Sequence, residues 1–212
     1  NLVQKIDLIN SYFDSENTDV KNNHTLPTEA DKKRLRLDQI NINDKLFRKF
    51  VYNSTKLPSK NSYSIDYWGY YNGANFNTSY IPNPDHFRTI SNTRIPGNNN
   101  NRGARFEYAK AATLSEMHYP TGGYEKYNYE LNQYTTNGAN RVPNWDNYNN
   151  LIEGVGLRIN SIELYDNNSL AKKIEYIYEG GNLPMKISFF REYSVSTAYT
   201  SPDPQTGGRF LQ

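Results

Sequence analysis

Short runs of alternating apolar and polar residues dominate this chain, and helical periodicity is scarce. Three segments share one pattern: an alternating run, a cluster of turn-forming residues, and a second alternating run that ends in aromatic residues. The segments are LRLDQININDKLFRKFVYN at 35–53, TLSEMHYPTGGYEKYNYELN at 113–132 and LRINSIELYDNNSLAKKIEYIYEGG at 157–181. Period-two alternation on both sides of a turn is typical of a β-hairpin. We therefore predict three antiparallel hairpins with turns at INDK, PTGG and DNNS.

Two further stretches resemble single strands, namely residues 2–10 and 186–195. The best helical composition lies at 28–38, where Thr28 is a suitable N-cap residue. Leu35 and Leu37 then fit the period of a strand, so we expect only a short helix before that strand begins.

Long polar loops separate the hairpins, at about 72–105 and at 132–150. Loops of this length inside a compact domain are usually functional or disordered. We expect the Asn run at 98–101 to be a mobile tip. The predicted organisation is an N-terminal strand and linker at 1–32, a hairpin-repeat domain at 33–195 and a C-terminal tail at 196–212.

Composition supports a folded, turn-rich β protein. The mean hydropathy is −0.89, yet 14% of the 212 residues are aromatic and 19 are Tyr, whereas disordered chains are poor in aromatic residues. Asn, which suits turns and left-handed backbone positions, occurs 30 times. The fold class is therefore predicted to be all-β, with stacked antiparallel hairpins in an irregular solenoid or open shell.

Charge and residue types exclude several function classes. A formal net charge of +2 provides no basic field, so nucleic acid is not predicted as a partner. The absence of Cys excludes disulfides and thiolate metal sites. No apolar run of about 18 residues is present, so no membrane span is predicted. The chain starts without Met, and we expect it to be a segment of a longer protein.

The stretch LSEMHYPTGGYEKYNYE resembles the tyrosine-and-aspartate (YD) repeat of the Rhs family. The matching positions are Tyr119, Gly122, Gly123, Tyr127, Tyr129 and Glu130. The third segment resembles the repeat more loosely, through Tyr165, Asp166, Tyr176, Tyr178 and Glu179. Glu stands in both where the family has a terminal Asp. The order SIDYWGYYNG, YPTGGYEKYNYE, GVGLRI also looks like large Rhs-like surface proteins of Gram-negative bacteria, over roughly 33–195.

This resemblance implies an extracellular or bacterial outer-surface protein, rich in β-hairpins and without catalysis of its own. Family members serve as surface adhesins or as shells around a secreted toxin. The expected function is a structural or adhesin module. Its expected partners are other parts of a larger parent chain or a surface protein complex, together with surface glycans.

The aromatic run DYWGYYNG at 66–73 is the main candidate site. On a strand, its rings would lie on both faces. One interpretation is a glycan platform made by Trp68, Tyr70 and Tyr71 with Asp66 beside them, because sugar C–H faces stack on aromatic rings that carry a polar group. The other, which we favour, is a cluster of core aromatic residues. A carbohydrate-binding module is therefore the alternative function.

Other chemistry is weakly indicated. His24, His86 and His118 have no metal-ligand spacing, and the Asp and Asn clusters at 144–147 and 166–168 fit turns better than a calcium loop. We expect neither a metal nor a cofactor. No nucleophile motif is present. The third alternative function is a glycan-active enzyme with a pair of catalytic carboxylates. The candidates for this pair are Glu107, Glu116, Glu125 and Glu130, because the fold rather than the sequence spacing brings such pairs together.

Overall fold

The computed structural model describes residues 4–15, 28–81, 99–134, 152–179 and 181, and also the strand backbones at 198–199 and 210–211. In chain order, the elements are β1 (Ile6–Asp14), α1 (Glu29–Lys32), β2 (Lys33–Ile42), β3 (Lys45–Tyr52), α2 (Phe106–Ala109), β4 (Leu114–His118), β5 (Tyr124–Tyr134), β6 (Ile152–Asp166), β7 (Ser169–Glu175), β8 (Ala198–Tyr199) and β9 (Phe210–Leu211).

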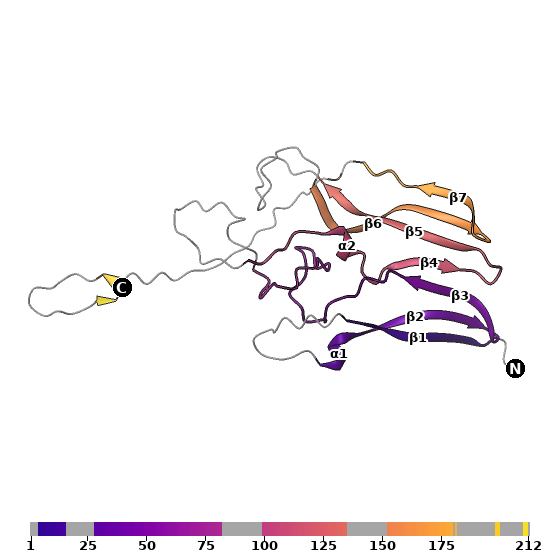
Figure 1. Cartoon of the computed structure of the whole chain (residues 1–212), viewed down its shortest axis with the longest axis horizontal. Coiled ribbons are helices and arrows are strands. Elements are labelled where there is room, and N and C mark those ends of the chain that lie inside the picture. The colour runs from indigo at the N-terminus through magenta and orange to yellow at the C-terminus, as the bar shows by residue number, and fades with distance from the viewer. Residues whose placement is uncertain are drawn as a thin grey trace, which may run out of the picture.

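Seven strands form one antiparallel sheet in which spatial order equals chain order, from β1 to β7 (Figure 1). The all-β class with stacked hairpins is therefore confirmed, and the three predicted hairpins are β2–β3, β4–β5 and β6–β7. β8 and β9 form a separate two-stranded pair. The predicted strand at 186–195 lies outside the described residues.

The turns explain part of the high Asn content. Asn43 and Asp44 connect β2 to β3 with φ of 49° and 63°, and Asn167 and Asn168 connect β6 to β7 with φ of 45° and 67°. Two central residues with positive φ make a type I′ turn, whose twist matches that of the flanking strands. In the middle hairpin Gly122 has a φ of 93° and closes a three-residue loop.

The three hairpins share a bulge in their first strand, where that strand pairs with the strand before it. In each case one residue of the hairpin has no opposite residue on the preceding strand, because the register slips by one. These extra residues are Asp38 opposite β1, Ser115 opposite β3 and Asn160 opposite β5. A bulge disrupts the hydrogen-bond ladder locally and increases the twist.

A tyrosine of the same hairpin donates its hydroxyl to the carbonyl that precedes each bulge. The pairs are Tyr52 to Leu37 at 2.8 Å, Tyr129 to Leu114 at 2.7 Å and Tyr178 to Ile159 at 2.6 Å. Each tyrosine is the last residue of an aromatic-x-Tyr triplet, which lies in or directly after the second strand of its hairpin. The sequence similarity of the three segments therefore corresponds to one structural unit, a bulged hairpin closed by a tyrosine.

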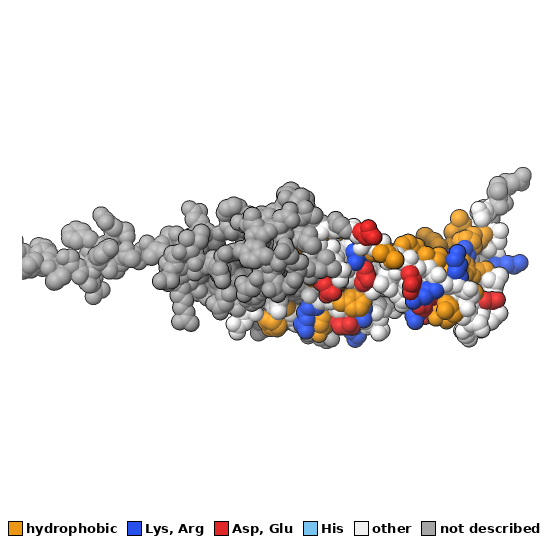
Figure 2. All heavy atoms as spheres, turned by 90° about the horizontal axis from the view of Figure 1, so that it is seen from above, with side chains coloured by type: hydrophobic (Ala, Val, Ile, Leu, Met, Phe, Trp, Pro, Cys, Tyr) orange, Lys and Arg blue, Asp and Glu red, His pale blue; other side chains and the backbone are white. Residues whose placement is uncertain are grey.

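Cross-strand side-chain pairs stabilise the sheet along its faces. His118, Tyr124 and Tyr165 stack across three adjacent strands, with ring centroids 4.9 Å and 4.7 Å apart. On the other face the Glu125 carboxylate accepts hydrogen bonds from the hydroxyls of Tyr119 and Tyr127. The stacked rings are cross-strand pairs, which are the unit of stabilisation in a sheet, whereas the Glu125 bonds link residues of one hairpin. Figure 2 shows hydrophobic side chains reaching the surface between basic and acidic ones.

Fully buried apolar side chains are few in the described residues and lie mainly at one end of the sheet. They are Tyr71, Ala74, Ala109, Ala111, Leu131 and Tyr134. They come from β5 and from the segments 53–81 and 99–113, which join β3 to β4 and lie beside the strand ends (Figure 1). We call these two segments the connecting loop.

The helix predicted near Thr28 is present as α1, a single turn. The Thr28 hydroxyl accepts a hydrogen bond from the Asp31 backbone, and the Asp31 carboxylate accepts one from the Thr28 backbone. This reciprocal capping box satisfies two backbone donors at the start of the turn. β2 then begins at Lys33, in agreement with the strand period seen from Leu35 onward.

The tyrosine that closes each unit should contribute measurably to stability. Tyr129→Phe removes the donor to the Leu114 carbonyl and is expected to lower the free energy of unfolding by about 1 kcal/mol in urea titrations. Tyr124→Phe is the matched control, because the Tyr124 hydroxyl bonds to no described group while its ring stays stacked. Equal losses in the two variants would contradict a specific role for the Tyr129 hydroxyl.

Candidate functional site

The four predicted platform residues all lie in the connecting loop, but they do not form one surface. Asp66 and Tyr71 are buried, with 1% and 5% of their surface exposed, whereas Tyr70 is 41% exposed. Trp68 is half-buried. The run DYWGYYNG therefore combines core side chains with one ring that faces outward.

Asp66 organises the local turn. Its Oδ1 accepts the backbone N–H groups of Trp68 and Tyr70, both at 2.9 Å. Its own backbone N–H donates to the Tyr70 carbonyl at 2.8 Å. Burial raises the pKa of Asp66, and the backbone donors of its turn and the Arg102 charge offset this only in part. The side-chain oxygen that could meet a ligand is thus engaged inside the loop.

Trp68 and Tyr70 dock onto glycines of β6. A Cβ atom at Gly154 would lie 2.7 Å from Cζ3 of Trp68, and one at Gly156 would overlap the Tyr70 ring. Only glycine leaves room for these rings. Val155 and Gly156 have φ of 60° and 83° and are skipped in the pairing of β5 with β6. The GVG sequence at 154–156 therefore provides the surface on which Trp68 and Tyr70 pack.

Tyr71 points into the loop core. Its hydroxyl donates to Oδ1 of Asn75 at 3.2 Å, and its ring meets the edge of Tyr108 with centroids 5.3 Å apart. Gly73 lies directly against Tyr108, so a Cβ there would overlap that ring. Tyr71 is thus a core aromatic residue, with part of its surface at the groove described below.

Buried asparagines hold the two halves of the loop together. Asn72 Nδ2 donates to the carbonyls of Asn101 and Gly103, at 2.9 Å and 3.1 Å. Asn77 Nδ2 donates to the Asn101 carbonyl at 2.8 Å, and Asn77 Oδ1 accepts the Asn101 backbone N–H at 2.7 Å. Both side chains have 0% exposure. They replace the backbone pairing that a strand would provide.

The Asn run predicted to be a mobile tip belongs to the same network over its described part, so that expectation was wrong for Asn100 and Asn101. Asn100 is 2% exposed, accepts the Thr78 backbone N–H at 2.9 Å and donates to the Ile81 carbonyl at 2.8 Å. Polar composition suggested exposure, but the amide groups satisfy buried backbone atoms.

Arg102 was missed as a structural residue. Its Nη2 donates to the Asp66 carbonyl and its Nη1 to the Tyr80 carbonyl, both at 2.5 Å. The guanidinium lies over the rings of Tyr67 and Tyr80, 5.4 Å and 5.7 Å from their centroids. Arg102 is 7% exposed. No local signal distinguishes it, since its partners are more than 20 residues away in sequence.

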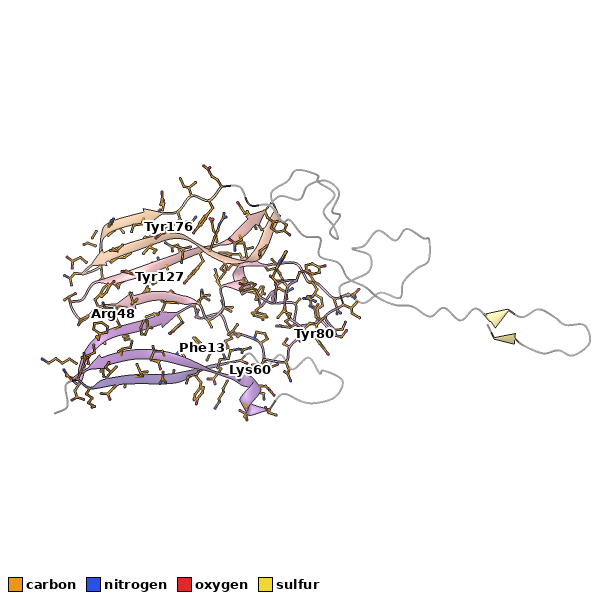
Figure 3. All side chains as sticks on the ribbon, turned by 180° about the vertical axis from the view of Figure 1, so that it is seen from behind. Phe13, Arg48, Lys60, Tyr80, Tyr127 and Tyr176 are labelled. Carbon is orange, nitrogen blue, oxygen red and sulfur yellow. The ribbon has the colours of Figure 1, made fainter. Side chains whose placement is uncertain are left out.

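An open groove of about 560 Å³ lies where the connecting loop meets β2, β5 and β6. Its lining includes two cations and four tyrosines: Arg34, Lys60, Tyr70, Tyr71, Tyr80 and Tyr129. Figure 3 places Lys60 and Tyr80 in the loop region beside the strand ends. The lining contains no Asp or Glu. Tyr70 and Tyr71 of the predicted platform therefore contribute to one concave site, while Trp68 and Asp66 do not line it.

The four carboxylates considered for catalysis lie elsewhere and are individually engaged. Glu107 pairs with Lys110 at 2.8 Å and Glu116 with His118 at 2.8 Å. Glu125 is held by two tyrosines. The remaining member, Glu130, has the partners described next.

Glu130 bonds Arg158 at 2.6 Å and Asn160 at 2.7 Å. Burial acts to raise its pKa, but these two hydrogen bonds and the Arg158 charge lower the pKa overall. A general acid needs the opposite shift. None of the four carboxylates lines the groove.

His118 is on β4 beside Glu116, and Asp166–Asn168 form the β6–β7 turn. In the described part of the chain, no three His, Asp or Glu side chains gather as a metal site would require. His24, His86 and the 144–147 cluster, with Trp145, lie outside that part.

Comparison of the chain with protein-family models, with curated proteins and with solved structures gives no match. Within the described residues, no helix has the length and apolar character needed to cross a membrane.

The Asp66 carboxylate provides a pH test of the loop. Because its pKa is raised in the folded protein above the ordinary value of 3.8, the folded state holds the proton more tightly than the unfolded chain. The stability contributed by Asp66 is therefore present at low pH and falls as pH rises through the raised pKa. Asp66→Asn keeps the Oδ1 acceptor without the charge, and should remove this fall.

Asp66→Ala is the matched variant, because it leaves the Trp68 and Tyr70 N–H groups without an acceptor. It should lower the free energy of unfolding by about 2 to 4 kcal/mol more than Asp66→Asn. Urea titrations at about pH 4 and about pH 7 separate the two effects. An Asn variant that follows wild type at both pH values, or an Ala variant as stable as the Asn variant, would count against this account.

Proposed function

We propose that the chain is a non-catalytic structural or adhesin module of a secreted or cell-surface bacterial protein of the Rhs-like type. The observation that carries the proposal is the bulged, tyrosine-closed hairpin, which occurs three times in one sheet. Units that pack edge to edge are typical of repeat proteins, in which each unit stabilises its neighbour. The similarity of this unit to the YD repeat supports an extracellular location.

The position of β1 suggests that the stack continues. β3 and β5, the second strands of their hairpins, each precede a bulged strand, and β1 stands in the same relation to β2. β1 thus takes the place of a second strand. No described strand pairs with its outer edge, where Ile6 and Leu8 are each 58% exposed. An apolar edge of this kind is a template for another strand.

The expected partner is therefore a further β-strand, from another part of a parent chain or from a surface complex. The non-catalytic part of the proposal rests on the groove, whose lining carries no carboxylate, and on the individual partners of the four Glu side chains.

A proline substitution on β1 tests the open edge. The Lys5 carbonyl accepts the Asn43 N–H at 2.9 Å, so alternation along the strand turns the N–H of Leu8 outward and that of Ile9 inward. Leu8→Pro removes only an outward donor, as edge strands tolerate. We expect wild type to associate with rising concentration in sedimentation velocity, and Leu8→Pro to associate less.

Two controls accompany this experiment. Leu8→Ala keeps the N–H group and should associate more than Leu8→Pro, whereas Ile9→Pro breaks the β1–β2 ladder and should destabilise the fold. A wild-type chain that stays monomeric at every concentration, or a Leu8→Pro variant that associates as wild type does, would contradict an edge built for pairing.

A further inference from the structure

The groove has the size and composition of a ligand site, which goes beyond the structural role. Its volume of about 560 Å³ lies within the range of roughly 300 to 1,000 Å³ that small-molecule sites occupy. Tyrosines supply apolar area together with a hydroxyl, as suits a half-wet surface. Tyr70 is the most accessible of the predicted rings, and its contact with Gly156 fixes it in place.

Two cations of the groove have no ion-pair partner in the described residues. Arg34 uses Nη1 to bond the Pro58 carbonyl at 2.8 Å and Ser15 Oγ at 3.2 Å, and its Nε and Nη2 bond no described group. Lys60 Nζ bonds the Ala30 carbonyl at 2.8 Å. Hydrogen bonds from Thr28 lower the pKa of Asp31, and the Lys60 charge contributes less. The Asp31 carboxylate accepts the Thr28 hydroxyl rather than the Lys60 ammonium group.

The environment of Arg34 favours an anionic ligand. Burial lowers the pKa of Arg34, because a charged guanidinium loses hydration there. Two bonds from Nη1 hold the group in one orientation, and the remaining N–H groups form the planar edge that matches a carboxylate. No Asp or Glu carboxylate lines the groove, so the charged side chains of its lining are both cations.

We propose that this groove binds an acidic sugar residue, with the sugar carboxylate at Arg34 and Lys60 and the sugar ring against Tyr70. The charge complementarity selects the carboxylate, and the exposed tyrosine ring offers a face for the sugar C–H groups. A polyphosphate chain fits less well, because a net charge of +2 gives no extended basic track.

The test uses the full chain and a panel of oligosaccharides ending in uronic or sialic acids, each paired with its methyl ester. The ester keeps the ring and removes the charge. Isothermal titration calorimetry should detect binding of at least one acid, with at least tenfold weaker binding of its ester. Lys60→Gln and Tyr70→Ala should each lower the affinity for the same acid by about tenfold.

Arg34→Gln should abolish binding, and because Arg34 also supports the fold, its melting temperature is measured beside the titration. Arg48→Gln is the control for charge, since Arg48 lies over Phe47 and Tyr119 on the sheet and outside the groove. It should bind as wild type does.

Absence of binding across the acid panel overturns the proposal, and so does equal binding of acid and ester. Equal losses in Lys60→Gln and Arg48→Gln would show a general charge effect and overturn it too. Tighter binding of a phosphopeptide or an RNA oligonucleotide through Arg34 and Lys60 would assign the groove to another ligand class. The edge experiment on Leu8 is independent of all these outcomes, because β1 contributes no lining residue.

Discussion

Every buried backbone N–H and C=O group must find a hydrogen-bond partner, and the connecting loop, in its described segments 53–81 and 99–113, meets this requirement without adding a strand to the main sheet. Asparagine side chains take the place of a neighbouring strand. Asn72, Asn77 and Asn100 donate to and accept from the backbone of both halves of the loop. Asp66 and Arg102 do the same around the aromatic run.

Because its buried backbone N–H and C=O groups are hydrogen-bonded, the connecting loop packs as a compact unit at the end of the sheet. Trp68 and Tyr70 can then rest on Gly154 and Gly156, which couples the loop to β6. The same contact positions the exposed Tyr70 ring at the groove. The structure of the loop, the attachment to the sheet and the candidate binding site thus depend on one set of polar contacts.

The hairpins show which features of the fold can be predicted from local sequence. Alternation and turn residues predicted β2–β3, β4–β5 and β6–β7 with their turns, because both signals act between neighbours along the chain. The bulges at Asp38, Ser115 and Asn160 carry no comparable signal, since register depends on the opposite strand. The tyrosine that bonds the carbonyl before each bulge is nevertheless visible in the sequence, as the last residue of a repeated aromatic-x-Tyr triplet.

The candidate site was predicted only in part. The aromatic run was located, and the preference for core packing holds for Tyr71. The positions of the Trp68 and Tyr70 rings depend on glycines more than 80 residues away, which no local pattern encodes. Arg34 and Lys60 belong to surface-like stretches in sequence, and only the fold brings them to the groove.

Hydrogen exchange at single-residue resolution tests the central claim, that the connecting loop is a folded body held by buried polar side chains. The backbone N–H groups of Ala74, Thr78 and Asn101 each donate to an Asn side chain. We predict that these three groups exchange about as slowly as the N–H groups of β5. Exchange at the rate of an unstructured peptide, with β5 still protected, would contradict it.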